Sequence, residues 1–139
     1  MIVLDTNVIS EPLKPLSNAA AVAWLDSQPR GSFYLCAPVL MEVLLGIAVL
    51  PAGKRKRNMA TAIESLLASY FADRFLAFDR EAAMMYASLA SRAAARGYIL
   101  SVADCQIAAI AAVHEFAVAT RDTAPFQAAG VRIVNPWEL

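Results

Sequence analysis

The chain has 139 residues, of which 59% are apolar, and its twelve basic and twelve acidic side chains give a net charge of zero. This length suffices for one domain that buries its own core without disulfides, so we expect a single domain over residues 1–139. The zero net charge argues against binding of nucleic acid through an overall positive field, so a polyanion would need a local basic patch or a metal ion.

The N-terminal run Ile2, Val3 and Leu4 predicts a strand that is buried on both faces of a parallel sheet, because β-forming residues follow one another without polar alternation. Asp5 then stands at the carboxyl end of that strand. Ligands bind at this edge in open α/β sheets. An equally simple interpretation is that Asp5 or Thr6 caps a helix that starts near Val8.

The next elements are predicted by proline and glycine positions and by apolar spacing. We expect a helix over about 17–27, a strand over 33–36, a helix opened by Pro38 that runs to about 50, and a helix over about 54–70. The apolar stretch 33–52 also has the length of a membrane span and is followed by four basic residues. Glu42 near its centre and Pro38 within it argue against a membrane helix.

The second half continues the alternation of strands and helices. We expect a strand over 75–78, a helix from Asp79 to Gly97, a helix from Ser101 to about His114, strands over 116–119 and 131–134, and a turn or one-turn helix over 125–128. This alternation predicts an α/β fold in which helices cover both faces of a parallel sheet.

Four acidic residues fall at strand ends or helix starts that such a sheet would bring to one edge. Glu42 and Asp104 have no charged residue three or four positions away, and Asp122 follows the strand 116–119 as Asp5 follows the first strand. A carboxylate in apolar surroundings is costly unless it is paired or holds a metal ion. Each also has a structural interpretation: Glu42 could face solvent, Asp104 could form a capping box with Ser101, and Asp122 could close an Asx turn.

Several motifs together carry a family resemblance along the whole chain. They are Leu4-Asp5-Thr6-Asn7-Val8-Ile9-Ser10-Glu11-Pro12, Glu42 on its helix, Ala103-Asp104 before Ile107-Ala108-Ala109, Ala119-Thr120-Arg121-Asp122-Thr123, and Asn135-Pro136-Trp137. In these motifs the sequence resembles PIN-domain proteins of the VapC toxin class, and within that class it resembles the FitB-like branch.

The resemblance implies a PIN fold of α/β/α layers with a short parallel sheet of four or five strands. It also implies a quartet of acids that holds Mg²⁺ or Mn²⁺, ribonuclease activity on structured RNA, and neutralisation by a small DNA-binding antitoxin that alone contacts operator DNA. Many PIN domains continue Thr-Arg-Asn-x-x-Asp-Phe after the fourth strand. Here Pro125 precedes Phe126, which leaves Asp122 to supply the fourth acid.

The residue types also fit this chemistry by themselves. Clustered carboxylates repel one another, and a divalent cation with oxygen ligands relieves the repulsion and can polarise a phosphodiester. We expect Asp5, Glu42, Asp104 and Asp122 to be the catalytic metal ligands, directly or through water. As supporting residues we expect Thr6 and Asn7 to orient Asp5 or a phosphate, Thr120 to support the fourth acid, and Arg121 to contact the nucleic acid or cover the edge of the site.

Composition suggests the surroundings and partners of the chain. The apolar fraction exceeds the usual value of roughly 45–50%, so we expect a homodimer with an interface within 38–70. Cys36 and Cys105 lack metal-ligand spacing and suggest core thiols in a reducing cytoplasm. No signal peptide is expected, because Asp5 interrupts the first apolar run.

Two other classes of function remain. A receiver domain could use Asp79 at the end of strand 75–78 as its phosphoacceptor, but it needs a late lysine, and no lysine follows Lys56. A non-catalytic protein that acts mainly by binding its antitoxin on DNA is the stronger alternative. Metal-dependent cleavage of RNA by the purified chain would distinguish it from the nuclease.

Overall fold

The computed structural model describes all residues, 1–139, and is built around one parallel sheet. Its five strands are β1 (Ile2–Leu4), β2 (Phe33–Cys36), β3 (Phe75–Leu76), β4 (Ala117–Ala119) and β5 (Ile133–Val134), in the order β3-β2-β1-β4-β5. All pairings are parallel, and β1 pairs with both β2 and β4. The expected parallel sheet is therefore confirmed.

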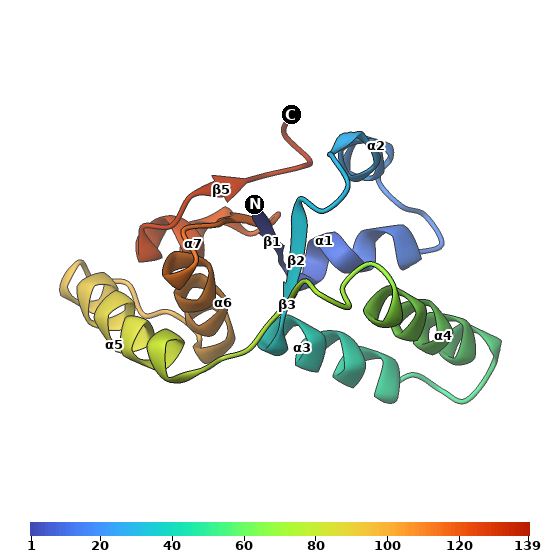
Figure 1. The fold of residues 1–139 in the computed structure, drawn as a ribbon, viewed down its shortest axis with the longest axis horizontal. Coiled ribbons are helices and arrows are strands. Elements are labelled where there is room, and N and C mark those ends of the chain that lie inside the picture. The colour runs from blue at the N-terminus through green and yellow to red at the C-terminus, as the bar shows by residue number, and fades with distance from the viewer.

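Seven α-helices and one 3-10 helix connect these strands. They are α1 (Thr6–Ser10), the 3-10 helix η1 (Glu11–Leu13), α2 (Ala19–Ser27), α3 (Ala37–Ala48), α4 (Lys54–Ala68), α5 (Arg80–Ala95), α6 (Val102–Val113) and α7 (Thr123–Ala129). Figure 1 shows α1, α3 and α4 on one side of the sheet and α5, α6 and α7 on the other. Parallel connections are right-handed, so the steps from β1 toward β3 place their helices on one face and the later steps place theirs on the opposite face.

The direction of the strand order reverses beside β1. From β1 the chain moves outward to β2 and β3, and it then returns to place β4 on the other side of β1. Such a reversal opens a crevice at the carboxyl ends of the neighbouring strands. Asp5, which directly follows β1, lies at this point.

One hydrophobic core underlies this edge. It contains 24 buried residues, among them Val3 and Val8 near the N-terminus and Ile107 and Ile110 on α6. Cys36 and Cys105 are both buried as free thiols, as expected. Because α6 is apolar on nearly every side, it packs between the sheet and α5. Its first turn contains Asp104, whose charge acts on Asp5 at the crevice.

The boundaries of several elements differ from the expectation by one or two residues, and the strand expected over 131–134 is β5, with only two residues. α1 starts at Thr6 rather than near Val8, because Asp5 caps it directly. β3 has two residues rather than four, since its partner β2 ends at Cys36 where α3 begins. α7 spans seven residues; Pro125 is tolerated because the first N–H groups of a helix need no intrahelical partner.

The stretch 33–52 forms β2, α3 and the turn that follows, which excludes it as a membrane helix. None of the helices combines the length and the apolarity that crossing a membrane requires.

Candidate active site

Asp5 is the buried centre of the candidate site. Its side chain is 6% exposed, and its Oδ1 accepts a 2.7 Å hydrogen bond from the backbone N–H of Thr6. Oδ2 accepts one from Thr120 Oγ1 at 2.7 Å and one from Asn7 Nδ2 at 3.0 Å. Asp5 therefore caps α1, and its carboxylate is also fixed by Asn7 of the same helix and by Thr120, which follows β4.

Thr6 connects Asp5 to Glu42. While its N–H donates to Asp5, its Oγ1 donates a 2.7 Å hydrogen bond to Glu42 Oε2. Glu42 lies in the first half of α3 and is half-buried. One threonine thus holds two carboxylates from different elements, and neither carboxylate pairs with a base, since the only ion pair in the structure joins Lys14 and Glu11.

Asp104 approaches the same centre from α6. Ser101 is the N-cap of α6 and accepts a 3.1 Å hydrogen bond from the backbone N–H of Asp104. This places Asp104 in the first turn, half-buried, with no hydrogen bond to its carboxylate. Only one half of the capping box that Ser101 and Asp104 could form is therefore present, and the Asp104 carboxylate is free.

The pKa of Asp5 reflects this proximity. Burial raises the pKa of Asp5 above its ordinary value, hydrogen bonds from Thr120 and Thr6 oppose the rise, and the charges of Asp104 and Glu42 add to it. Burial also raises the pKa of the neighbouring Cys36 thiol to about 12, with further contributions from Asp5 and Glu42. Cys36 is thus a protonated core thiol.

Asp122 lies apart from the other three acids. It is exposed, precedes α7 without a side-chain capping bond, and is not among the charges that shift the pKa of Asp5. Its backbone N–H donates a 3.0 Å hydrogen bond to Thr120 Oγ1. The structure thus brings Asp5, Glu42 and Asp104 together, and it links Asp122 to them only through the buried Thr120.

Asn7 and Arg121 close the side of the site near β4. Asn7 Nδ2 donates to Asp5, and Asn7 Oδ1 accepts a 3.1 Å hydrogen bond from the backbone N–H of Arg121. The Arg121 guanidinium lies over the ring of Trp137, 5.8 Å from its centroid. A positive charge is therefore held at the rim by an aromatic side chain from the C-terminal segment.

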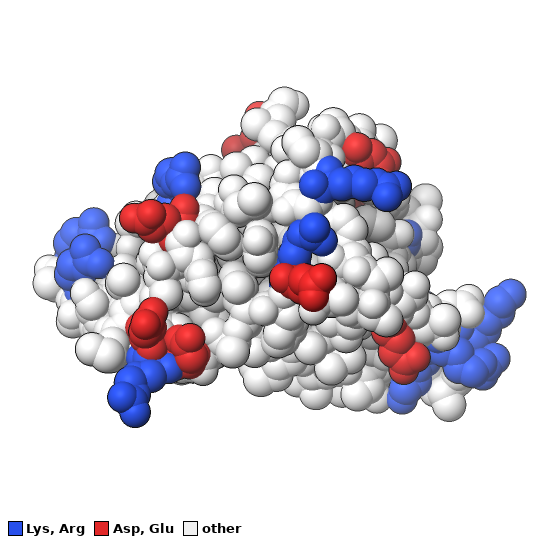
Figure 2. All heavy atoms as spheres, viewed as in Figure 1, with Lys and Arg blue, Asp and Glu red and all other residues white.

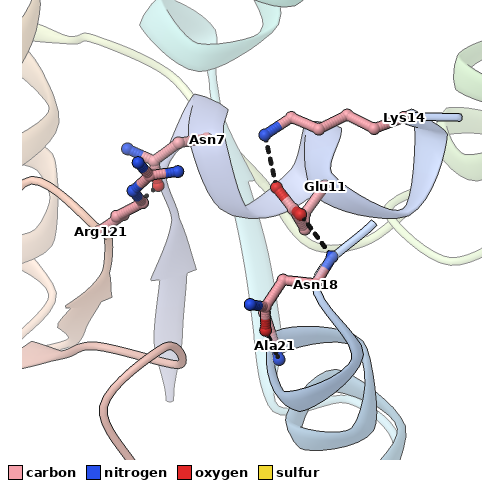
Figure 3. A network of polar contacts seen from close by, with 6 residues as sticks. All are labelled: Asn7, Glu11, Lys14, Asn18, Ala21 and Arg121. Carbon is pink, nitrogen blue, oxygen red and sulfur yellow. Dashed lines mark hydrogen bonds and ion pairs between the residues drawn. The ribbon is translucent and has the colours of Figure 1, made fainter. Parts of the chain in front are cut away.

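Glu11 is a buried acid for which the sequence predicted no role beyond its place in the N-terminal motif. Its Oε2 lies 2.6 Å from Lys14 Nζ, and its Oε1 accepts a 2.7 Å hydrogen bond from the backbone N–H of Asn18, as Figure 3 shows. Asn18 in turn caps α2 by accepting from Ala21 N–H at 3.0 Å. Glu11 thus fixes the loop between η1 and α2. The only local feature of the sequence that indicated this role was Lys14, three residues later, as a possible ion-pair partner.

A model of the family described as PIN domain matches residues 2–131. The chain belongs to the PIN-domain family.

Two relatives match along 99% of both chains. VapC ribonuclease Y4jK from Sinorhizobium fredii is 46% identical, and Toxin FitB from Neisseria gonorrhoeae is 47% identical. The crystal structure of FitAcB from Neisseria gonorrhoeae contains a chain that matches with a TM-score of 0.95 at 47% identity, with all of both chains covered. A second structure, of FitAB bound to an IR36 DNA fragment, also gives a TM-score of 0.95. These matches confirm the resemblance to VapC toxins and to the FitB-like branch.

PIN-domain VapC proteins are generally dependent on a divalent metal, and the donor set of this site fits such an ion. Three carboxylates without basic partners offer the hard oxygen ligands that Mg²⁺ prefers. In the present conformation, however, no group of three Asp, Glu, His or Cys side chains is close enough to hold a metal ion. The like charges repel one another, and Glu42 is held by Thr6, so ion binding requires that these side chains turn toward Asp5 or coordinate through water.

Proposed function

We propose that this protein is the toxin of a type II toxin-antitoxin system and that it hydrolyses phosphodiester bonds of RNA in a Mg²⁺-dependent reaction. The observation that supports this most strongly is the group of three carboxylates, Asp5, Glu42 and Asp104, which lie without ion-pair partners where the strand order reverses. Bringing three such charges together is costly, and a divalent cation offsets that cost. The name of VapC ribonuclease Y4jK supports RNA as the substrate.

Each residue of the site has a proposed role. Asp5, Glu42 and Asp104 hold Mg²⁺, for which Mn²⁺ can substitute, and Asp122 acts as an outer ligand through water. When bound, the ion polarises the scissile phosphate and helps to deprotonate the attacking water.

The supporting residues position these acids and the substrate. Thr120 and Asn7 fix the orientation of Asp5 through hydrogen bonds to Oδ2. Thr6 sets the spacing between Asp5 and Glu42. Arg121, stacked on Trp137 at the rim, supplies a positive charge that binds an RNA phosphate next to the one being cut.

The partners follow from the solved relatives. The crystal structure of FitAcB and the structure of FitAB bound to an IR36 DNA fragment each contain a chain of this fold. We propose that this chain likewise pairs with a small antitoxin, that operator DNA is contacted by the antitoxin alone, and that RNA cleavage takes place in the cytoplasm. In this arrangement the nuclease is inactive as long as the antitoxin is bound to it.

Expression of the chain without its antitoxin tests this function. The parent should arrest growth within a few doublings, and sequencing of RNA 5′ ends after brief expression should show new ends at a small set of sites. Asp5→Asn should remove both effects while it accumulates to the same level. Growth arrest by a folded Asp5→Asn protein would instead favour the alternative, a non-catalytic protein that acts by binding its antitoxin on DNA.

A further inference from the structure

A nuclease whose site is acidic needs another surface to attract its substrate. The three carboxylates repel an RNA backbone, and the chain as a whole has no net charge. Binding of a polyanion therefore requires a local concentration of free positive side chains.

The longest run of basic side chains is Lys54-Arg55-Lys56-Arg57, at the start of α4. Figure 2 shows basic atoms gathered at the right edge of the molecule, where Figure 1 places the beginning of α4. The four residues are not equivalent. Lys56 Nζ donates hydrogen bonds to the backbone carbonyls of Ala48 and Leu50, at and just after the C-terminal end of α3. Lys54, Arg55 and Arg57 are exposed and form no hydrogen bond or ion pair within the chain.

Two of these free residues line a hollow together with residues from another segment. The hollow, of about 460 Å³, is lined by Leu13, Lys14, Pro15, Lys54, Arg55, Asn58 and Met59. No acidic side chain lines it. Glu11 neutralises part of the charge of Lys14, so Lys54 and Arg55 contribute the uncompensated charge.

The position of this charge is unfavourable for the isolated protein. Cations at a helix N-terminus oppose the helix dipole, and Gly53 provides no side-chain cap to the first turn of α4. An anion in the hollow relieves the first problem, because it neutralises the cations and accepts hydrogen bonds from their side chains.

The hollow is also within reach of the acidic site. α1 and η1 follow one another from Thr6 to Leu13, so Lys14 lies roughly 15 Å from Asp5 at helical rises of about 1.5 to 2 Å per residue. That distance corresponds to roughly four stacked nucleotides at about 3.4 Å each. A single RNA strand can therefore occupy both places at once.

We propose that the hollow formed by Lys14, Lys54, Arg55 and Asn58 binds the phosphate backbone of the RNA strand whose scissile bond lies at Asp5. This inference rests on the proposed ribonuclease function and adds to it a substrate-binding surface at the C-terminal end of η1. The contacts are to phosphates, so they contribute affinity without base specificity.

The test uses a fluorescein-labelled 12-nucleotide oligouridine and fluorescence anisotropy in EDTA, which prevents cleavage. Lys54→Gln/Arg55→Gln should weaken binding about tenfold and reduce the slope of log K against log salt by about 1.4, since each phosphate contact on a single strand contributes about 0.7. The matched control is Arg80→Gln/Arg92→Gln, which removes the same charge from exposed positions on α5. It should change neither quantity.

The outcomes separate this inference from the proposed function. Equal RNA affinities for the Lys54→Gln/Arg55→Gln variant and the control would overturn the inference. It would also be overturned if that variant bound RNA like the parent but bound the antitoxin more weakly, because the hollow would then be a binding site for the antitoxin. If the parent binds RNA through the hollow but does not cleave it with Mg²⁺, the hollow is an RNA-binding site and the ribonuclease assignment is wrong. Thermal denaturation of both double variants checks that they are folded.

Discussion

Thr120 donates a 2.7 Å hydrogen bond from Oγ1 to Asp5 Oδ2, and this contact joins residues 115 positions apart in the chain. Thr120 is fully buried, and the same oxygen accepts a hydrogen bond from the backbone N–H of Asp122. The loop after β4 is therefore tied to the central acid of the site by one hydroxyl group.

Thr120→Val keeps the shape of this side chain and removes the hydroxyl. We expect a loss of about 2 kcal/mol in the free energy of unfolding, because a buried carboxylate oxygen loses a donor and a backbone N–H loses an acceptor. RNA cleavage should fall roughly tenfold, since Asp5 is less well oriented. Urea denaturation and cleavage assays measure the two effects. Thr61→Val, at an exposed position on α4, is the control and should change neither.

The role of the fourth acid can be separated from that of the first three. Asp122 is exposed and linked to Asp5 only through Thr120, so Asp122→Asn should need more Mg²⁺ for cleavage and should be partly rescued by Mn²⁺. Asp5→Asn and Asp104→Asn should lose cleavage at all metal concentrations. Cleavage rates against metal concentration for the three variants give the comparison. If Asp122→Asn follows the parent curve throughout, Asp122 is a turn residue and the site has three acids.

Glu11 should make stability depend on pH. The hydrogen bond from Lys14 is the main reason why the pKa of Glu11 lies below its ordinary value of 4.5. The ionised form is therefore favoured by folding, so its contribution is complete above pH 4.5 and is lost as the pH falls through the lower pKa of the folded state.

Glu11→Gln should thus lower the melting temperature by roughly 4 °C near pH 7, which corresponds to about 1 kcal/mol, and the difference from the parent should shrink below pH 4. Melting curves between pH 3 and pH 8 measure this. Glu64→Gln, at an exposed position on α4, serves as the control. A difference that stays constant across this pH range would show that the ion pair with Lys14 does not stabilise the fold.

An apolar face on α3 supports the expected homodimer. Met41, Leu44, Leu45 and Val49 recur at helical spacing and are 47–72% exposed. A second subunit that covers this face would account for the high apolar fraction. Light scattering should show a dimer at micromolar concentration and a monomer for Leu45→Glu. Leu16→Glu, an equally drastic change at a residue 93% exposed before α2, should remain dimeric. A parent that is monomeric at micromolar concentration both with and without antitoxin would contradict the expectation.

Local patterns were sufficient to predict the sheet and the positions of its acids. The buried run before Asp5 identified a strand end, and the absence of nearby charge singled out Glu42 and Asp104. Thr6 and Asn7 were expected to orient Asp5, and both donate hydrogen bonds to it. The hydrogen bond from Thr6 to Glu42 could not be predicted, because it spans 36 residues and only the fold brings the two together. The burial of Glu11 was missed for the same reason, since its partner Asn18 N–H is set by the path of the loop.

The most direct test of the central claim is RNA cleavage by the purified chain, freed from antitoxin, with Asp104→Asn prepared in parallel. The parent should cut a structured RNA in the presence of Mg²⁺, stop when EDTA is added and resume when Mg²⁺ is restored. Asp104→Asn should keep its melting temperature within a few degrees of the parent value and give no products, because it removes one of the three carboxylates around Asp5. Cleavage that persists in EDTA, or that Asp104→Asn retains at the parent rate, would contradict a metal-dependent nuclease built on these acids.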